Sequence, residues 1–474
     1  MILSKVVQLF TQNFAHVPTT DQQTVIEKLS SFVISTTENR IFLLKGYAGT
    51  GKTTIVGVLV KILPKLGLNS LLLAPTGRAA KVLASYSANH AYTIHKAIYK
   101  SNEDDSGYSL SLRENKTSNT IFIVDEASMI AGEMLANNSL FPSSNLLEDL
   151  LTFVFSGINC SIIFVGDTAQ LPPIGTQISP ALDEKFLKAN FHIAIGNFEL
   201  SKVFRQTEES GILANATHIR TLIYQSDITK NFFETKNFND VIQISGSDLE
   251  DMLNTAYSAS GDTETLVICR SNKRANLYNN EIRRRILYRE GEINAGDKIM
   301  IVKNNYFWIA KKSKAGFIAN GDIAEILRIK NIEVIENDFS FADATIRLID
   351  YPEEKDIDVK LLLNTLNSES PSLSSLDFKK LYNVISNEYA HIPERYKQMK
   401  MIRNDPYLNA LQIKFAYALT CHKTQGGQWE NVFVEQGYLT DEMVNKEYMR
   451  WLYTAVTRAT KKLYLVNFHE RFFR

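Results

Sequence analysis

Residues 46–54 combine glycine, lysine and threonine in a pattern that binds phosphate. They read Gly-Tyr-Ala-Gly-Thr-Gly-Lys-Thr-Thr and follow the apolar run 41–44, so a buried strand leads into a glycine-rich turn and a helix begins at Lys52. The glycines let backbone N–H groups face a phosphate at the positive end of that helix. We expect Lys52 to reach the β- and γ-phosphates and the Thr53 hydroxyl to ligate Mg²⁺. The pattern predicts a nucleoside triphosphate site, most simply for ATP, formed by Gly46, Gly49, Thr50, Gly51, Lys52, Thr53 and Thr54.

An acidic pair, Asp125 and Glu126, closes the apolar run 121–124. Acidic pairs after strands are common, so their meaning here depends on the phosphate loop upstream. In that context Asp125 would hold Mg²⁺ and Glu126 would orient or deprotonate the attacking water. After a further apolar run, Gln170 is an uncharged polar group that would sense the γ-phosphate, and the two prolines that follow it stiffen its loop.

The elements that must position these groups alternate between strand and helix. Short apolar runs at 70–74, 120–125 and 160–166 predict strands, and a helix is expected over 77–85. This alternation indicates an α/β fold with a doubly wound parallel sheet, whose ligands bind at the carboxyl ends of the strands.

Composition limits the class of protein. The chain has 474 residues, 45% of them hydrophobic, with no apolar run of membrane-spanning length and no signal-peptide pattern at its start. Cys160, Cys269 and Cys421 are far apart and show no metal or redox spacing, so we expect buried free thiols in a reducing cytoplasm. Lys+Arg and Asp+Glu both number 52, so any nucleic-acid site is a local groove rather than a basic surface.

Several ordered motifs resemble superfamily 1 helicases of the 5′→3′ branch, the RecD-like and Dda-like enzymes. They lie at 19–22, 74–80, 93–96, 200–206, 417–426 and 453–459. The resemblance implies that Gln22 reads adenine, that 74–80 grips a single strand, and that Gln425 and Gly426 belong to the nucleotide site. It also implies that Arg205 reaches across to the triphosphate.

Arg205 and Arg458 also have a physical interpretation as catalytic residues. Both follow the first sheet, and the second half of the chain has no phosphate loop of its own. An arginine that reaches across a cleft to a transferring phosphoryl group contributes roughly 10³–10⁵ in rate. A surface salt bridge is the commoner role of a single arginine. Arg458 lies within the apolar, helix-like run 451–459, which favours the catalytic role.

The second half of the chain is expected to form a partner domain. Runs at 266–269, 415–419, 432–434 and 463–466 predict its strands. We therefore predict two RecA-like doubly wound parallel-sheet domains, with a small hairpin insert in the first and an SH3-like β-barrel insert in the second. The predicted boundaries are 1–200 for the first domain with its insert at about 97–119, 201–295 and 409–474 for the second, and 296–408 for the barrel with a polar, helix-prone extension.

The hairpin insert has two interpretations. Its turn-rich acidic tip at 102–107 suits the strand-separating pin that the resembled family places near here, because acidic residues repel a phosphate backbone. An ordinary surface hairpin fits equally well. Residues 361–404 match the family least.

Nucleic-acid contacts are expected in loops at the strand ends of both domains. His95 and His422 occupy matching motifs, although single histidines are more often structural. Aromatic residues such as Tyr92, Tyr99, Phe307 and Trp308 are candidates for base stacking. The predicted strand-binding set is Thr76, Gly77, Arg78, Thr93, His95 and Lys96 in the first domain and Asn272, Thr420, His422 and Lys423 in the second.

These features together predict an ATP-dependent helicase that moves 5′→3′ on single-stranded DNA and unwinds duplex junctions. We expect it to act as a monomer and not to associate with a membrane. The direction rests on the resemblance alone. An RNA helicase on the same scaffold, or an ATP-dependent clamp that does not unwind, are the alternatives. Intact Glu126, Arg205 and Arg458 favour hydrolysis over a static clamp.

Overall fold

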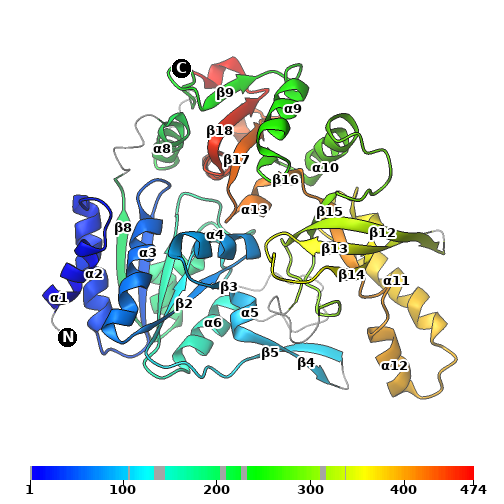
Figure 1. The fold of residues 1–474 in the computed structure, drawn as a ribbon, viewed down its shortest axis with the longest axis horizontal. Coiled ribbons are helices and arrows are strands. Elements are labelled where there is room, and N and C mark those ends of the chain that lie inside the picture. The colour runs from blue at the N-terminus through cyan, green and yellow to red at the C-terminus, as the bar shows by residue number, and fades with distance from the viewer. Residues whose placement is uncertain are drawn as a thin grey trace.

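The computed structural model describes residues 3–104, 107–132, 145–202, 210–225, 232–309, 317–336 and 338–474. Figure 1 shows one parallel sheet with its helices below a second sheet, and a β-barrel beside both. Among the described residues, no helix combines the length and the apolarity that a membrane crossing requires.

The first sheet has six parallel strands in the order β3-β2-β6-β7-β1-β8. The central strands are apolar on both faces because helices cover both sides of the sheet. Helices α1 to α3 pack on one face, and α5 and α6 pack on the other. The strands are β1 Arg40–Gly46, β2 Asn69–Ala74, β3 Ala91–Thr93, β6 Thr120–Val124, β7 Ser161–Gly166 and β8 Ala194–Leu200. The helices are α1 Leu3–Gln12, α2 Thr20–Ile34, α3 Lys52–Ile62, α4 Gly77–Ser87, α5 Ile94–Ile98, α6 Leu146–Phe155 and α7 Glu184–Asn190.

A two-stranded hairpin follows α5. Its strands, β4 Tyr99–Asp104 and β5 Gly107–Leu112, pair antiparallel, which confirms the predicted hairpin insert. Part of the acidic tip, residues 105 and 106, lies outside the described residues. The choice between a pin and an ordinary hairpin therefore stays open.

The second sheet is also parallel, in the order β16-β10-β17-β18-β9. Every residue of β10 is buried, as expected for a central strand covered on both faces. The strands are β9 Val241–Ile244, β10 Thr265–Cys269, β16 Ala418–Thr420, β17 Trp429–Glu435 and β18 Ala459–Val466. The helices are α8 Gly211–Ile223, α9 Leu249–Ser260, α10 Asn272–Glu281, α13 Cys421–Thr424 and α14 Lys446–Val456. Two RecA-like domains are thus present, as predicted.

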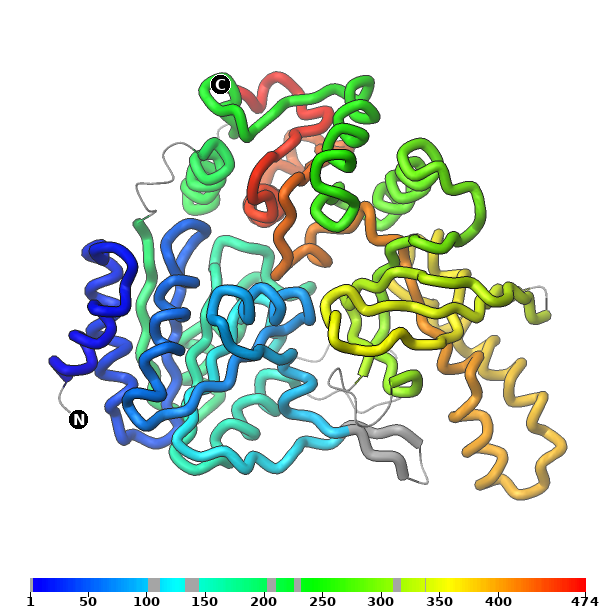
Figure 2. The backbone as a smooth tube through the Cα atoms, viewed as in Figure 1, coloured from blue at the N-terminus to red at the C-terminus, as the bar shows by residue number. Residues whose placement is uncertain are grey.

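A closed five-stranded barrel interrupts the second domain, in agreement with the predicted SH3-like insert. Its last strand pairs antiparallel with its first strand and parallel with its fourth. The tube in Figure 2 shows the chain leaving the second domain, tracing the barrel, and returning. The strands are β11 Lys298–Ile301, β12 Ile323–Ile335, β13 Phe339–Leu348, β14 Ile357–Leu362 and β15 Leu411–Phe415.

The helix-prone extension forms two helices, α11 Ser375–Glu388 and α12 Arg395–Arg403. They bury Leu381, Ile385 and Ile402 against the apolar side chains of the barrel. The extension and the barrel therefore share one hydrophobic core.

The single strand predicted over 415–419 is wrong. Phe415 ends β15 in the barrel, and Ala418 begins β16 in the second sheet. Tyr417 lies between them, fully buried, and its hydroxyl accepts a hydrogen bond from the Lys298 backbone at 2.9 Å. The apolar run is continuous because the chain stays buried as it passes from one core to the other.

Candidate active site

The phosphate loop joins β1 to α3, as predicted. Gly49 and Gly51 adopt φ values of 75° and 89°, which favour glycine. A Cβ at Gly46 would lie 2.9 Å from the Thr50 hydroxyl oxygen, so the loop cannot accept a side chain there. The Lys52 ammonium donates to the carbonyl oxygens of Gly46 at 2.6 Å and Tyr47 at 2.8 Å. The loop and its lysine thus form a compact unit at the positive end of α3.

The two threonines after Lys52 are exposed, whereas Thr50 is buried. Thr53 at the start of α3 is therefore open to solvent, and its Mg²⁺ role stays a prediction. Thr50 instead donates its hydroxyl to the Tyr47 carbonyl oxygen at 2.8 Å. Its side chain shapes the loop from within.

Gln22 contacts the phosphate loop from α2. It forms a capping box, in which its Oε1 accepts from the Thr19 backbone at 2.9 Å. Its Nε2 donates to the Thr50 carbonyl oxygen at 3.5 Å. Gln22 thus supports the loop, and its contact with adenine stays a prediction.

The acidic pair lies at the end of β6. The Tyr86 hydroxyl donates to Asp125 Oδ2, and Asp125 Oδ1 accepts from the Glu126 backbone at 2.9 Å. Glu126 has a left-handed φ of 51°, an uncommon conformation that is found at functional turns. Burial raises the pKa of Glu126, and Asp125 and Asp167 add to this effect while Arg458 and Lys52 oppose it. A carboxylate with a raised pKa suits a general base.

Arg458 comes from the second domain and is buried. It does not lie within a helix as predicted, because α14 ends at Val456 and β18 begins at Ala459. Its guanidinium donates to the carbonyl oxygens of Thr454 at 3.0 Å and Gly427 at 3.1 Å. Its charge acts on the carboxylates of both Glu126 and Asp167. The structure therefore brings Lys52, Asp125, Glu126 and Arg458 together. Arg205 lies outside the described residues.

The loop after β7 docks onto the second domain. Gln170 is buried, and its Oε1 has no hydrogen-bond partner among the described residues. The neighbouring Leu171 is held on both sides: its N–H donates to the Thr454 hydroxyl at 2.9 Å, and its carbonyl oxygen accepts from Gln425 Nε2 at 2.6 Å. The predicted γ-phosphate sensor therefore lies on a loop clamped between the domains.

The glycine after Gln425 brings the two domains into close approach. Gly426 has a φ of 74°, and a Cβ there would lie 2.7 Å from Ala79 Cβ of α4. In this structure Gln425 and Gly426 form interdomain contacts. Their place in the nucleotide site stays a prediction.

Two functional candidates, Asp167 and Tyr453, were missed. The buried Asp167 accepts a hydrogen bond from the Tyr453 hydroxyl at 2.6 Å. Burial raises the pKa of Asp167, against the opposing charges of Lys52 and Arg458. A signal was available, because Asp167 follows an apolar strand just as Asp125 does.

The predicted strand-binding residues of the first domain lie around α4 and α5. Thr76 and Thr93 cap these helices with their side chains. Gly77 faces the barrel, where a Cβ would lie 2.7 Å from Asp322 Oδ1. The Arg78 guanidinium contacts the second domain through the Gln428 carbonyl oxygen, at 2.8 Å. Its contact with a strand stays a prediction.

His95 and Lys96 lie between the first domain and the barrel. Burial lowers the pKa of His95 to about 4, so its ring is neutral near pH 7. The ring lies 5.7 Å from that of Tyr99 and 6.4 Å from that of Phe317 in the barrel. The Lys96 ammonium lies 5.6 Å from the ring centroids of both Tyr92 and Tyr351. Of the four stacking candidates, Tyr92 is exposed, whereas Tyr99 is buried.

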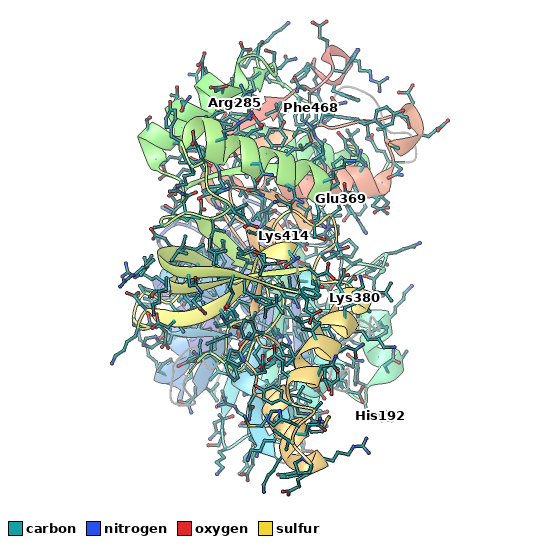
Figure 3. The ribbon with its side chains drawn as sticks, turned by 90° about the vertical axis from the view of Figure 1, so that its right-hand side faces the viewer. His192, Arg285, Glu369, Lys380, Lys414 and Phe468 are labelled. Carbon is teal, nitrogen blue, oxygen red and sulfur yellow. The ribbon has the colours of Figure 1, made fainter. Side chains whose placement is uncertain are left out.

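The predicted residues of the second domain lie where α10 and α13 begin. Asn272 donates to the Glu369 carbonyl oxygen at 3.0 Å, and Thr420 occupies the N-cap position of α13 without a side-chain capping hydrogen bond. Burial lowers the pKa of Lys423 to about 8 and also lowers that of His422. Lys414 lies close enough to Lys423 for their charges to interact. Its ammonium donates a hydrogen bond to the Ser368 carbonyl oxygen at 2.5 Å. Figure 3 views this side and shows Glu369 and Lys414 above Lys380 of α11.

Two parallel sheets, one phosphate loop and an arginine from the second sheet beside the acidic pair of the first define a nucleotide-binding protein with two RecA-like domains. The sequence matches the AAA domain family over residues 19–222 and the UvrD-like helicase C-terminal domain over residues 415–466. These matches, with RecD and Dda among the relatives, are consistent with the superfamily 1 helicases that the sequence motifs resemble.

Two named relatives and one solved structure are similar to the chain. The chain is 23% identical to the RecBCD enzyme subunit RecD of Buchnera aphidicola, over 93% of this chain and 73% of that protein. It is 25% identical to the ATP-dependent DNA helicase dda of Enterobacteria phage T4, over 54% and 55% of the two chains. A structure of two coordinating Pif1 helicases on forked duplex DNA aligns at 16% identity with a TM-score of 0.47, over 97% and 94% of the chains.

Proposed function

We propose that this protein is an ATP-dependent DNA helicase that translocates 5′→3′ on single-stranded DNA and unwinds duplex. The observation that carries the proposal is the shared site: Arg458 of the second domain acts electrostatically on Glu126 of the first, beside Lys52. A site divided between two domains makes hydrolysis sensitive to their separation. Relatives named as DNA helicases support the choice of reaction.

Hydrolysis is proposed to use residues from both domains. Lys52 and the N–H groups of its loop bind the phosphates. The Thr53 hydroxyl and the Asp125 carboxylate are oxygen ligands of the kind that Mg²⁺ prefers, and Mg²⁺ held there would offset phosphate charge. Glu126, with its raised pKa, orients and deprotonates the attacking water. Arg458, and Arg205 by the family pattern, stabilise charge as the terminal phosphoryl group leaves.

Movement is proposed to follow from changes in the domain junction. Thr454 and Gln425 of the second domain hold the loop of Gln170, so a change at the phosphates reaches both domains. Residues of the strand-binding set lie on both sides of this junction. Alternating grip by the two sides moves the protein along a strand.

We also propose a cytoplasmic location, action as a monomer, and the domain boundaries predicted above. Support for a reducing compartment comes from Cys160, Cys269 and Cys421, which are buried free thiols. An intramolecular site with residues from both domains supports action as a monomer, because it needs no second chain.

A strand-displacement assay tests the proposal. Duplexes with a 5′ tail should be unwound with ATP, and duplexes with a 3′ tail should not. ATPase activity should rise with single-stranded DNA. Greater stimulation by RNA would favour the RNA-helicase alternative, and stimulation without displacement would favour a clamp. Indifference to both nucleic acids would overturn the proposal.

A further inference from the structure

One buried hydroxyl joins three segments of the domain junction. Tyr453 lies on α14 of the second domain and is fully buried. Its Oη accepts a hydrogen bond from the Ala48 N–H of the phosphate loop at 3.0 Å and donates one to Asp167 Oδ2 at 2.6 Å. The other oxygen of Asp167 accepts from the Ala169 backbone at 2.9 Å. A single side chain of the second domain thus bonds to the phosphate loop and to the loop after β7.

The residues beside Tyr453 extend this connection to Arg458. Thr454 accepts from the Leu171 N–H at 2.9 Å through its hydroxyl. The Thr454 carbonyl oxygen accepts from Arg458 Nε at 3.0 Å. The turn that contacts the first domain therefore also holds the catalytic guanidinium.

We infer that Tyr453 is a positioning residue for ATP hydrolysis, whose hydroxyl fixes α14 relative to the phosphate loop and so positions Arg458, which is bonded to the last turn of that helix. The inference rests on the proposed function. Tyr453 would act by positioning other groups and not by taking part in the reaction. Its hydroxyl is hydrogen-bonded to the backbone of the phosphate loop and to Asp167, not to the reacting groups assigned above. A misplacement of about 1 Å can cost about 10²-fold in rate.

Other contacts keep the domains together when this hydroxyl is removed. The Arg78 guanidinium lies 4.0 Å from the Trp429 ring centroid, and that of Arg220 in α8 lies 4.2 Å from the Tyr47 ring centroid. Tyr453→Phe keeps the buried ring and loses only the two hydrogen bonds. We therefore expect a folded, docked protein in which Arg458 is less well placed.

Tyr448→Phe is the matched control. Tyr448 lies on the same helix and is buried, and its hydroxyl has no hydrogen-bond partner among the described residues. We expect Tyr453→Phe to lower kcat for DNA-stimulated ATP hydrolysis at least ~10-fold with less than ~3-fold change in KM, the pattern of a lost transition-state interaction. Tyr448→Phe should change neither.

Two further measurements separate positioning from a general loss of structure. Hydrogen–deuterium exchange should rise in the phosphate-loop peptide 46–51 of Tyr453→Phe and stay unchanged in Tyr448→Phe. Because Tyr453 and Asp167 act through one hydrogen bond, Tyr453→Phe combined with Asp167→Asn should be less harmful than the product of the two single effects.

Outcomes for the inference and for the proposed function differ. A wild-type protein that fails to hydrolyse ATP overturns the proposed function. A wild-type protein that hydrolyses ATP, together with an unchanged kcat in Tyr453→Phe, overturns only the inference. The inference would also be overturned if the loss of ATPase activity in the double variant equalled the product of the losses caused by Tyr453→Phe and Asp167→Asn alone.

Discussion

The Arg78 guanidinium of the first domain stacks on the Trp429 indole of the second, with its Cζ 4.0 Å from the ring centroid. Its Nη2 also donates to the Gln428 carbonyl oxygen at 2.8 Å. The predicted strand-binding motif around Thr76 is therefore in contact with the start of β17. A cation over an indole contributes about 0.5–2 kcal/mol, so this contact stabilises the docked arrangement of the two domains.

Replacing Arg78 distinguishes a domain contact from a strand contact. Arg78→Ala should reduce the stimulation of ATPase by single-stranded DNA while leaving the salt dependence of DNA binding unchanged. Each phosphate contact contributes about −0.7 to the log–log salt slope, so a slope that became shallower by this amount would instead place Arg78 on the strand. Fluorescence anisotropy across a salt series measures the slope.

Removing the Lys52 ammonium tests the phosphate loop. Lys52→Ala should lower ATP hydrolysis by at least ~100-fold, because the group assigned to the transferring phosphoryl is lost. The fold should survive, since Lys52 is only half-buried. Lys61→Ala, at an exposed position of the same helix, is the control and should keep normal turnover. ATPase rates and thermal melts report both properties. Near-normal hydrolysis in Lys52→Ala would refute the assignment.

Glu126 should separate nucleotide binding from turnover. Glu126→Gln keeps Asp125 and should bind Mg-ATP normally, yet turn over at least ~100-fold more slowly, the size of a lost general base. Only the deprotonated carboxylate accepts a proton, and burial raises its pKa. Wild-type kcat should therefore rise with pH through that raised pKa, and the variant should lose this rise. Lost nucleotide binding would indicate a metal-binding or structural role instead.

Much of the fold could be predicted from the sequence because its central strands are apolar runs. β1, β6 and β7 are covered on both faces, so burial alone marks them. β8 was missed because only Leu200 of its seven residues is buried. It also contains Gly196, where a Cβ would lie 2.8 Å from a Phe42 ring carbon. An edge strand of this kind carries no apolar run.

Within the site, the groups that lie on one continuous segment could be predicted from the sequence, whereas the contacts between distant segments could not. The groups of the phosphate loop lie on one continuous stretch, so their spacing defines their arrangement. Tyr453 meets Ala48 and Asp167 only because two domains dock. No local pattern encodes a pairing between residues so far apart in the chain.

Asp322 of the barrel should make stability depend on pH. Burial beside Asp350 raises its pKa to about 7, against the opposing charge of Lys96 and a hydrogen bond from the Ala319 N–H. The folded state thus binds a proton that the unfolded state releases near pH 4. Stability from this group is therefore greatest at low pH and is lost as the pH rises toward 7. Asp322→Asn should flatten the fall in Tm between about pH 4 and 7. An equally steep fall would contradict the assignment.

Lys423 should make the affinity for single-stranded DNA depend on pH, and an arginine at this position should reduce that dependence. Burial lowers its pKa to about 8, and Lys414 beside it also has a pKa lowered to about 8 by burial and by the charge of Lys423. Affinity for single-stranded DNA should therefore weaken as the pH rises from 7 to 9. Lys423→Arg keeps its charge over this range and should retain more of its pH 7 affinity at pH 9 than the wild type.

Lys423→Gln removes the charge at every pH. It should bind more weakly already at pH 7 and with a log–log salt slope shallower by about 0.7, the share of one phosphate on a single strand. Four to six such contacts give the wild type a slope of about −3 to −4, modest because the chain has no net charge. Fluorescence anisotropy with a labelled oligonucleotide measures both dependences. If Lys423→Gln kept the wild-type slope and affinity, Lys423 would lie off the strand.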